Sequence, residues 1–236
     1  MPPPSPSNRS ANKLLSRLAT AEFDLLEPHL KAVELPVRKL LENRDTPIEH
    51  VYFIEHGFAS VVADGAGKRS IEVGVIGREG MTGLAVLMGA SQSPHETYMQ
   101  ASGDGQSLPA SKLRQLIGQS ASLHRTFLRY GYAFVIQTAQ TAMANGRSRL
   151  EDRLARWLLM AQDRLDGDDV PLTHEFLSIM LGVRRPGVTI ALNLLEYRGL
   201  IQARRGGVTI VDRAGLLETS NGAYGASEAE FQRLFG

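Results

Sequence analysis

Apolar and polar positions change their period part-way along the chain. Between about Val33 and Pro109, short β-rich runs cover residues 50–54, 58–63, 70–76 and 96–101. In the third run Ile71, Val73 and Val75 alternate with other residues, as on one face of a strand. Asp64-Gly65-Ala66-Gly67, which separates the second and third runs, is typical of a hairpin turn. Short strands with frequent turns predict a barrel or a sandwich.

After Pro109 the apolar positions take helical spacing. One face of a long predicted helix carries, at steps of four and three, Leu123, Phe127, Tyr130 and Phe134. A second face carries Leu128, Tyr132, Val135, Ala139 and Ala142. A helix that is apolar on two sides needs two partners. We expect the first face to form a dimer seam with the same helix of a second subunit, and the second face to lie against the barrel. A buried helix in a monomer is the alternative.

The C-terminal part reads as two short helices followed by a hairpin. Thr173 begins the first helix as its N-cap, and Gly182 supplies a tight turn. Pro186 stands in the first turn of the second helix, where its missing N–H costs nothing. Two strands follow, joined by a tip at 204–207. A helix, a glycine turn, a helix and a β-wing together predict a winged helix-turn-helix.

Arginines cluster in this segment. Residues 172–213 contain six arginines (184, 185, 198, 204, 205 and 213) and three acidic residues (175, 196 and 212), an excess of three positive charges. Because Arg binds phosphates by charge and reads guanine by paired hydrogen bonds, the pattern indicates DNA. The expected contacts come from both helices and from the wing: Thr173, Arg184, Arg185, Thr189, Ile190, Asn193, Arg204 and Arg205.

Composition excludes several other classes of protein. The 236 residues include no cysteine, which excludes disulfides and thiolate-held clusters and fits a reducing compartment. The chain has neither a secretory signal nor an apolar run long enough to span a membrane, so we expect a cytoplasmic protein. Common nucleotide-binding and hydrolase motifs are missing, which argues against an enzyme. His50 and His56 without a third ligand do not indicate a metal site, and we expect no cofactor.

These features resemble the superfamily of the cyclic-AMP receptor protein and the fumarate–nitrate regulator (Crp–Fnr). Segments 172–201 and 153–159 (RLARWLL) are similar to its DNA-binding domain, and 50–64 and 77–87 (GREGMTGLAVL) to its β-roll. The resemblance implies an α+β protein with an N-terminal β-roll of the cyclic-nucleotide-binding jelly-roll type, a long dimerisation helix and a C-terminal winged helix-turn-helix. It also implies a homodimer on a near-palindromic double-stranded DNA operator, with RNA polymerase as a further partner if the protein is an activator.

The chain departs from the cyclic-AMP-binding pattern of this superfamily. Where such members have Gly-Glu-Leu, this sequence has Gly83-Leu84-Ala85, and the later Arg-Ser pair is replaced by His95-Glu96. A carboxylate at 96 repels a phosphate, so we expect cyclic AMP to bind weakly or not at all. A different small effector, or none, is left open. The candidate effector pocket comprises Glu79, Gly80, Gly83, Leu84, His95, Glu96 and Thr138.

The sequence thus predicts a disordered tail (1–10), a sensor domain (11–118), a dimerisation helix with its hinge (119–146) and a DNA-binding domain (147–236). The expected function is a sequence-specific DNA-binding transcription regulator. The alternative is a cyclic-nucleotide-type signalling module whose winged helix binds protein rather than DNA.

Overall fold

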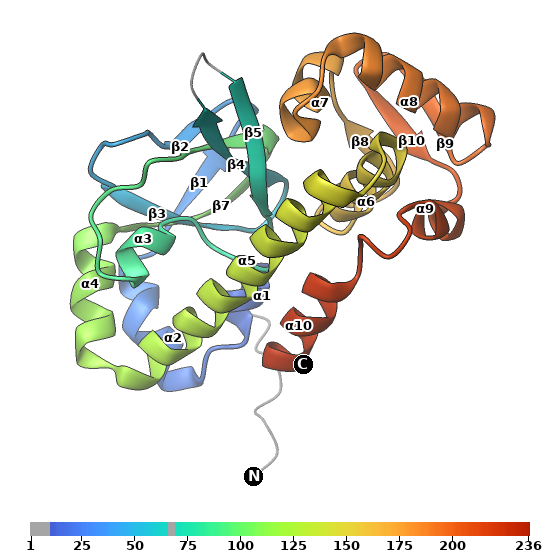
Figure 1. The fold of residues 1–236 in the computed structure, drawn as a ribbon. Coiled ribbons are helices and arrows are strands. Elements are labelled where there is room, and N and C mark those ends of the chain that lie inside the picture. The colour runs from blue at the N-terminus through green and yellow to red at the C-terminus, as the bar shows by residue number, and fades with distance from the viewer. Residues whose placement is uncertain (1–9, 66–68) are drawn as a thin grey trace. The chain divides into compact units, whose positions relative to one another are not determined.

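The computed structural model describes residues 10–65 and 69–236 (Figure 1). Most of the predicted tail and the tip of the predicted hairpin at 66–67 lie outside these residues. Contacts divide the chain into two compact units, one of residues 1–61, 76–134 and 234–236 and the other of residues 62–75 and 135–233. The domain boundaries expected from the sequence are not decided by this division and stay a prediction.

The N-terminal part is built from antiparallel strands between short helices. The helices are α1 (Lys13–Ser16), α2 (Thr20–Leu26), the 3-10 helix η1 (Glu27–His29), α3 (Leu84–Leu87) and α4 (Ala110–Gln119). The strands are β1 (Lys31–Leu35), β2 (Leu40–Glu42), β3 (His50–Ile54), β4 (Phe58–Gly65), β5 (Arg69–Ile76), β6 (Glu96–Ala101) and β7 (Gly103–Pro109). They form a sheet of order β1-β7-β3 and another of order β2-β6-β4-β5. The predicted strand runs are confirmed to within two residues at each end.

Buried apolar side chains from these strands make the core of the first unit. Val51, Phe53 and Ile54 of β3 are fully buried, as is Phe58 of β4. In the β3–β7 pairing Val51 stands opposite Leu108, which is also fully buried. Burial of such large apolar side chains is the main favourable contribution to folding. His50 begins β3, whereas His56 follows its end and its Nδ1 lies 2.8 Å from Asp104 Oδ1.

The long helix α5 (Ala121–Arg147) reverses the face assignment made from the sequence. Leu123 and Phe127 are fully buried and Tyr130 is 3 % exposed, within a single protomer. The rings of Phe127 and Phe53 lie 5.9 Å apart, and the Tyr130 hydroxyl donates to the Met81 carbonyl at 3.0 Å. Phe134 is half-buried. The predicted dimer seam is therefore corrected: Leu123, Phe127 and Tyr130 are buried within the protomer, so they are not available to a second subunit.

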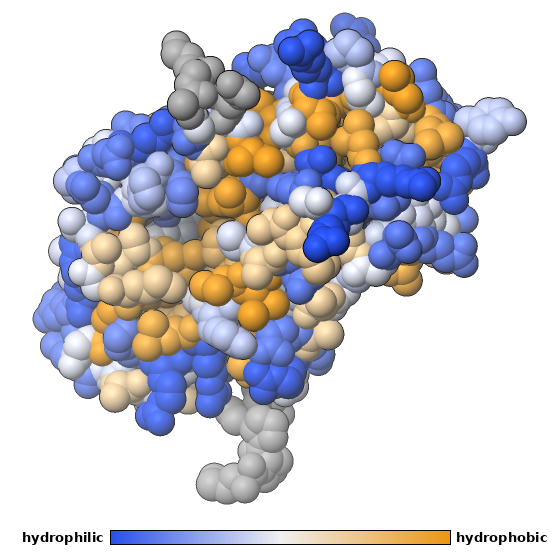
Figure 2. Space-filling model, viewed as in Figure 1, coloured by the Kyte–Doolittle hydropathy of each residue, from blue (hydrophilic) through white to orange (hydrophobic). Residues whose placement is uncertain are grey.

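A second face of α5 is exposed instead. Leu128, Tyr132 and Val135 are 41 %, 49 % and 51 % exposed, and Ala139 and Ala142 are exposed as well. Their steps of four, three, four and three residues trace one straight stripe, which we call the α5 stripe (128, 132, 135, 139 and 142). In Figure 2 orange and pale orange side chains lie along this helix.

The second unit contains α6 (Leu150–Gln162) and a helix-turn-helix followed by a wing. Its other elements are β8 (Asp169–Pro171), α7 (His174–Leu181), α8 (Arg185–Tyr197), β9 (Ile201–Arg204), β10 (Gly207–Ile210), α9 (Arg213–Thr219) and α10 (Ala226–Phe235). The strands form an antiparallel sheet of order β8-β10-β9. The α+β class and the winged helix-turn-helix predicted from the sequence are confirmed. None of the helices in 10–65 and 69–236 is long and apolar enough to cross a membrane.

Candidate nucleic-acid interface

The first helix of the motif is fixed by its two ends. The Thr173 hydroxyl accepts a hydrogen bond from the Phe176 amide at 3.2 Å, which satisfies one free N–H of the first turn. At the other end Gly182 adopts the left-handed region, with φ of 60°, and closes α7. Leu177 and Leu181 are buried on the inner face of α7, and Val188 and Leu195 on that of α8. The turn therefore holds the two helices at a fixed angle and leaves the outer side of α8 free.

The start of α8 presents two arginines to solvent. Arg184 is the extended N-cap and Arg185 is the first helical residue, with Pro186 directly after it. Arg185 Nη2 lies 3.5 Å from Glu175 Oε2, and both side chains are more than half exposed. A pair this open to water stabilises the fold by about 1 kcal/mol at most, so a nucleic acid can displace the carboxylate at little cost.

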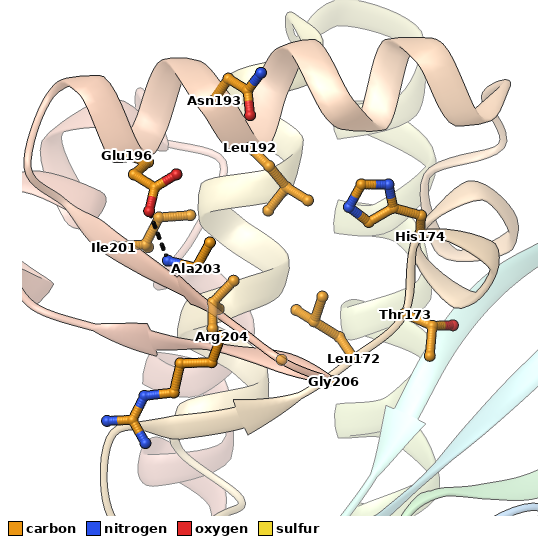
Figure 3. Close-up of a pocket in the computed structure, with 12 residues that line it drawn as sticks. Leu172, Thr173, His174, Leu192, Asn193, Glu196, Ile201, Ala203, Arg204 and Gly206 are labelled. Carbon is orange, nitrogen blue, oxygen red and sulfur yellow. Dashed lines mark hydrogen bonds between the residues drawn. The ribbon is translucent and has the colours of Figure 1, made fainter.

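Further along α8, polar and apolar side chains lie on neighbouring strips. The Thr189 hydroxyl donates to the Arg185 carbonyl and lies 3.2 Å from His174 Nδ1. Ile190 is 70 % exposed although it is a large apolar residue. Asn193 is exposed and projects outward from the helix, as Figure 3 shows. Sequence reasoning did not single out His174; its position directly after an N-cap was the available signal.

The two arginines of the wing, Arg204 and Arg205, differ in their partners. Arg204 Nη1 lies 2.8 Å from Asp169 Oδ2 on β8, and Thr209 donates to the other oxygen of that carboxylate, also at 2.8 Å. Gly207, which pairs with Arg204 in the sheet, has no side chain to obstruct this reach across β10. Figure 3 shows the Arg204 guanidinium turned away from α8. Arg205 is exposed at the tip and has no hydrogen-bond or ion-pair partner within the described residues.

A groove of about 280 Å³ runs between α8 and the wing, lined by Leu172, Thr173, His174, Leu192, Asn193, Glu196, Ile201, Ala203, Arg204, Gly206, Gly207 and Val208. The Glu196 carboxylate accepts a hydrogen bond from the Ala203 amide at 2.8 Å (Figure 3). This bond ties β9 to α8 and fixes how far the wing stands from the helix. The eight residues predicted for DNA contact all lie in this motif or its wing, and all are exposed except the half-buried Thr189.

In the candidate effector pocket of the N-terminal part, Gly83 is hydrogen-bonded to a buried carboxylate of the chain itself. Glu42, at the end of β2, is 8 % exposed; one carboxylate oxygen accepts the Gly83 amide and the other the Thr97 hydroxyl, the latter at 3.2 Å. Burial raises the pKa of the Glu42 carboxyl, while these hydrogen bonds oppose the rise. Sequence reasoning missed Glu42 because a lone acidic residue at the end of a short strand gives no signal of its own.

The other predicted pocket residues differ in their burial and in the unit to which they belong. Gly80 lies so close to Tyr130 that a Cβ atom on it would clash with the phenol oxygen. Glu79, Leu84, His95 and Glu96 are half-buried. Thr138 belongs to the second unit. Whether these residues bind an effector stays a prediction.

Comparison with known proteins identifies the motif and the fold. Residues 152–219 match the family model of the Crp-like helix-turn-helix domain. A protein described as a transcriptional regulator of the Crp/Fnr family from Eubacterium rectale is 19 % identical, with a TM-score of 0.70 over 88 % of this chain and 97 % of that one. A CRP-family transcriptional regulator from Thermus thermophilus is 18 % identical, with a TM-score of 0.70 over 82 % and 99 %.

A third solved structure, FixK2 from Bradyrhizobium japonicum, is 15 % identical, with a TM-score of 0.67 over 80 % of this chain and 96 % of that one. At such identities the likeness is one of fold. No curated protein matched the sequence.

Proposed function

We propose that this chain, which carries a Crp-like helix-turn-helix domain on the fold of the Crp–Fnr superfamily, is a sequence-specific DNA-binding transcription regulator that acts as a homodimer. The observation that carries this proposal is the exposed side of α8. Arg185, Thr189 and Asn193 follow one another there at steps of four residues, and none of them belongs to the buried core of the domain. Eight residues of helix rise about 12 Å, which is the width of the major groove.

The proposed DNA contacts are of two kinds, to bases and to the phosphate backbone, according to where each residue lies in the motif. We propose that Arg185, in the first turn of α8, reads a base edge, with guanine as its best partner through O6 and N7. Arg205, exposed at the wing tip without a partner in the described part of the chain, is placed for a phosphate. Thr173, at the start of α7, and Arg184, at the start of α8, are proposed to contact the DNA backbone and so position the motif. Arg204 is held by Asp169 and serves the DNA less directly than the sequence alone suggested.

The α5 stripe supports the homodimer. Its five members repeat with the heptad spacing of a two-stranded coiled coil, and its exposed leucine, tyrosine and valine lie open to water in the protomer. A second copy of α5 laid along this stripe removes those side chains from water. Two-fold symmetry then presents two copies of α8 to two half-sites, so we propose a near-palindromic operator.

Regulation is proposed to depend on an effector other than cyclic AMP, or on none. The Glu42 carboxyl group already accepts the Gly83 amide, so that amide is not free to donate to a phosphate. Whether the regulator activates, and so meets RNA polymerase, depends on the operator's place in its promoters.

Selection of binding sites from random DNA with the purified protein tests the proposal. We expect a two-fold-related consensus, and we expect Arg185→Ala to weaken operator binding by about 1–3 kcal/mol per half-site, with the loss confined to one symmetric base pair. Arg198→Ala is the matched control, because it removes an exposed arginine at the far end of the same helix. Absence of any selected sequence, or of salt-dependent binding, refutes the DNA-binding function and favours a winged helix that contacts protein.

A further inference from the structure

Ile190 is an apolar side chain on the part of α8 that is proposed to enter the major groove. It is 70 % exposed, far more than a residue with a place in the domain core. Pro186, one turn earlier on the same strip of the helix, is exposed too. Apolar surface held in water is unfavourable, so a helix that keeps this strip bare gains when an apolar group covers it.

The spacing along α8 sets what Ile190 can reach. Pro186 and Ile190 form one strip and Arg185 and Thr189 the neighbouring one, and both lead to Asn193, which follows Thr189 by four residues and Ile190 by three. Ile190 stands five residues after Arg185, a rise of about 7.5 Å along the helix. At about 3.4 Å per base pair this is a step of roughly two base pairs.

The major groove offers one apolar group, the 5-methyl of thymine; the other base edges present hydrogen-bond donors and acceptors. We infer that Ile190 reads a thymine methyl within about two base pairs of the guanine contacted by Arg185. This inference rests on the proposed function and deepens it, because it names the base chemistry that the operator must offer. If another base stands at that position, its hydrogen-bond donors and acceptors face the isoleucine without partners, which adds to the preference for thymine.

Tyr197, the most exposed apolar residue of α8, does not compete for this role. Tyr197 is 90 % exposed, but it stands seven residues beyond Ile190, a further rise of about 10.5 Å. Together with the distance from Arg185, this exceeds the width of the groove. Tyr197 therefore serves as a matched control for loss of an exposed apolar side chain from the same helix.

Replacing thymine by deoxyuridine in the selected operator tests the inference, because it deletes only the methyl group. Burial of one methyl-sized group corresponds to about a fourfold change in affinity, so the wild-type protein is expected to lose roughly fourfold per half-site at one thymine position. Ile190→Ala is expected to bind the thymine operator more weakly by a similar factor and to be indifferent to the uracil substitution. Ile190→Val is expected to keep most of the methyl dependence, and Tyr197→Ala all of it.

The possible failures are distinct. A wild-type protein that selects no sequence removes the proposed function itself. A protein that binds its operator but does not respond to uracil at any thymine, or whose consensus has no thymine within two base pairs of the guanine, overturns the reading by Ile190 and leaves DNA binding intact. The same holds if Ile190→Ala retains the wild-type response to uracil. Thermal unfolding of each variant shows whether the helix is intact; alanine at an exposed helical position favours the helix over isoleucine.

Discussion

Phe127 and Leu128 are neighbours on α5, one buried and one exposed, and they give the sharpest test of how this helix is used. Phe127 is fully buried against the protomer, while Leu128 is 41 % exposed on the α5 stripe. We expect alanine at 127 to damage the fold, and alanine at 128 to weaken the dimer without damaging the fold.

The cost at 127 comes from a cavity. The Phe127 ring packs 5.9 Å from that of Phe53 and has no exposed surface. Removing such a ring costs about 3–5 kcal/mol, a large fraction of the 5–15 kcal/mol that holds a typical domain folded. The midpoint of urea unfolding should fall accordingly, whatever the protein concentration.

The cost at 128 falls on association. About half of the Leu128 side chain is already buried in the protomer, so its removal from the interface forfeits about 1 kcal/mol per chain. Both chains of a symmetric dimer lose it, which makes about 2 kcal/mol, or roughly thirtyfold in the dimer dissociation constant. Adding Tyr132→Ala should weaken the dimer further.

Sedimentation equilibrium over a range of concentrations measures the dimer, and urea unfolding measures the fold. A Leu128→Ala/Tyr132→Ala protein that dimerises as tightly as the wild type refutes the assignment of the α5 stripe. So does a Phe127→Ala protein that keeps its stability and becomes monomeric, since that outcome returns the interface to the face proposed from the sequence.

Two further predictions concern the wing and the N-terminal part. Arg205→Ala should lower the slope of log affinity against log salt concentration by about one unit per subunit, on operator and scrambled DNA alike. Arg204→Ala should change this slope less, because Arg204 is paired with Asp169. Equal changes in salt titrations of the two variants would show that Arg204 leaves Asp169 for DNA. Because burial raises the pKa of Glu42 on folding, its protonated form is favoured in the native state, so the stability it contributes in acid is lost as pH rises through the raised pKa. Glu42→Gln, which cannot ionise, should therefore gain stability relative to the wild type between acid and neutral pH in urea unfolding, and a constant difference across that range would contradict the shift.

Local chemistry made the winged helix-turn-helix predictable. Thr173 as N-cap, Gly182 in a left-handed turn and Pro186 in the first turn of α8 each allow few conformations, and the structure has all three. The strands followed for a similar reason, since alternation and turn residues determine them over short distances. The expected contact residues therefore lie on the helices and the wing that the sequence predicted, and their contact with DNA stays a prediction.

The face of α5 was not predictable in this way. Both of its apolar stripes have heptad spacing, and the sequence alone does not tell which one the protomer buries. Large aromatic side chains at 127 and 130 suggested a subunit contact, yet they fill the protomer's core. Glu42 and Asp169 were missed because their partners, Gly83 and Arg204, lie 41 and 35 residues away in the chain. Such pairings come from tertiary packing, which no local pattern contains.

The two faces of α5 also bear on the genetics of the protein. Loss of a side chain such as Phe127 removes folded protomers, so a second, intact gene copy supplies the function and the defect is recessive. In the homodimer proposed above, loss of Arg185 leaves the α5 stripe whole, so defective chains still pair with intact ones and give dimers with only one intact copy of the DNA-reading residues. We expect such alleles to be dominant. A second substitution that disrupts the α5 stripe in the same defective chain should prevent mixed dimers and make the allele recessive. Whether an allele is dominant or recessive would then distinguish residues that bind DNA from residues needed for dimerisation or folding.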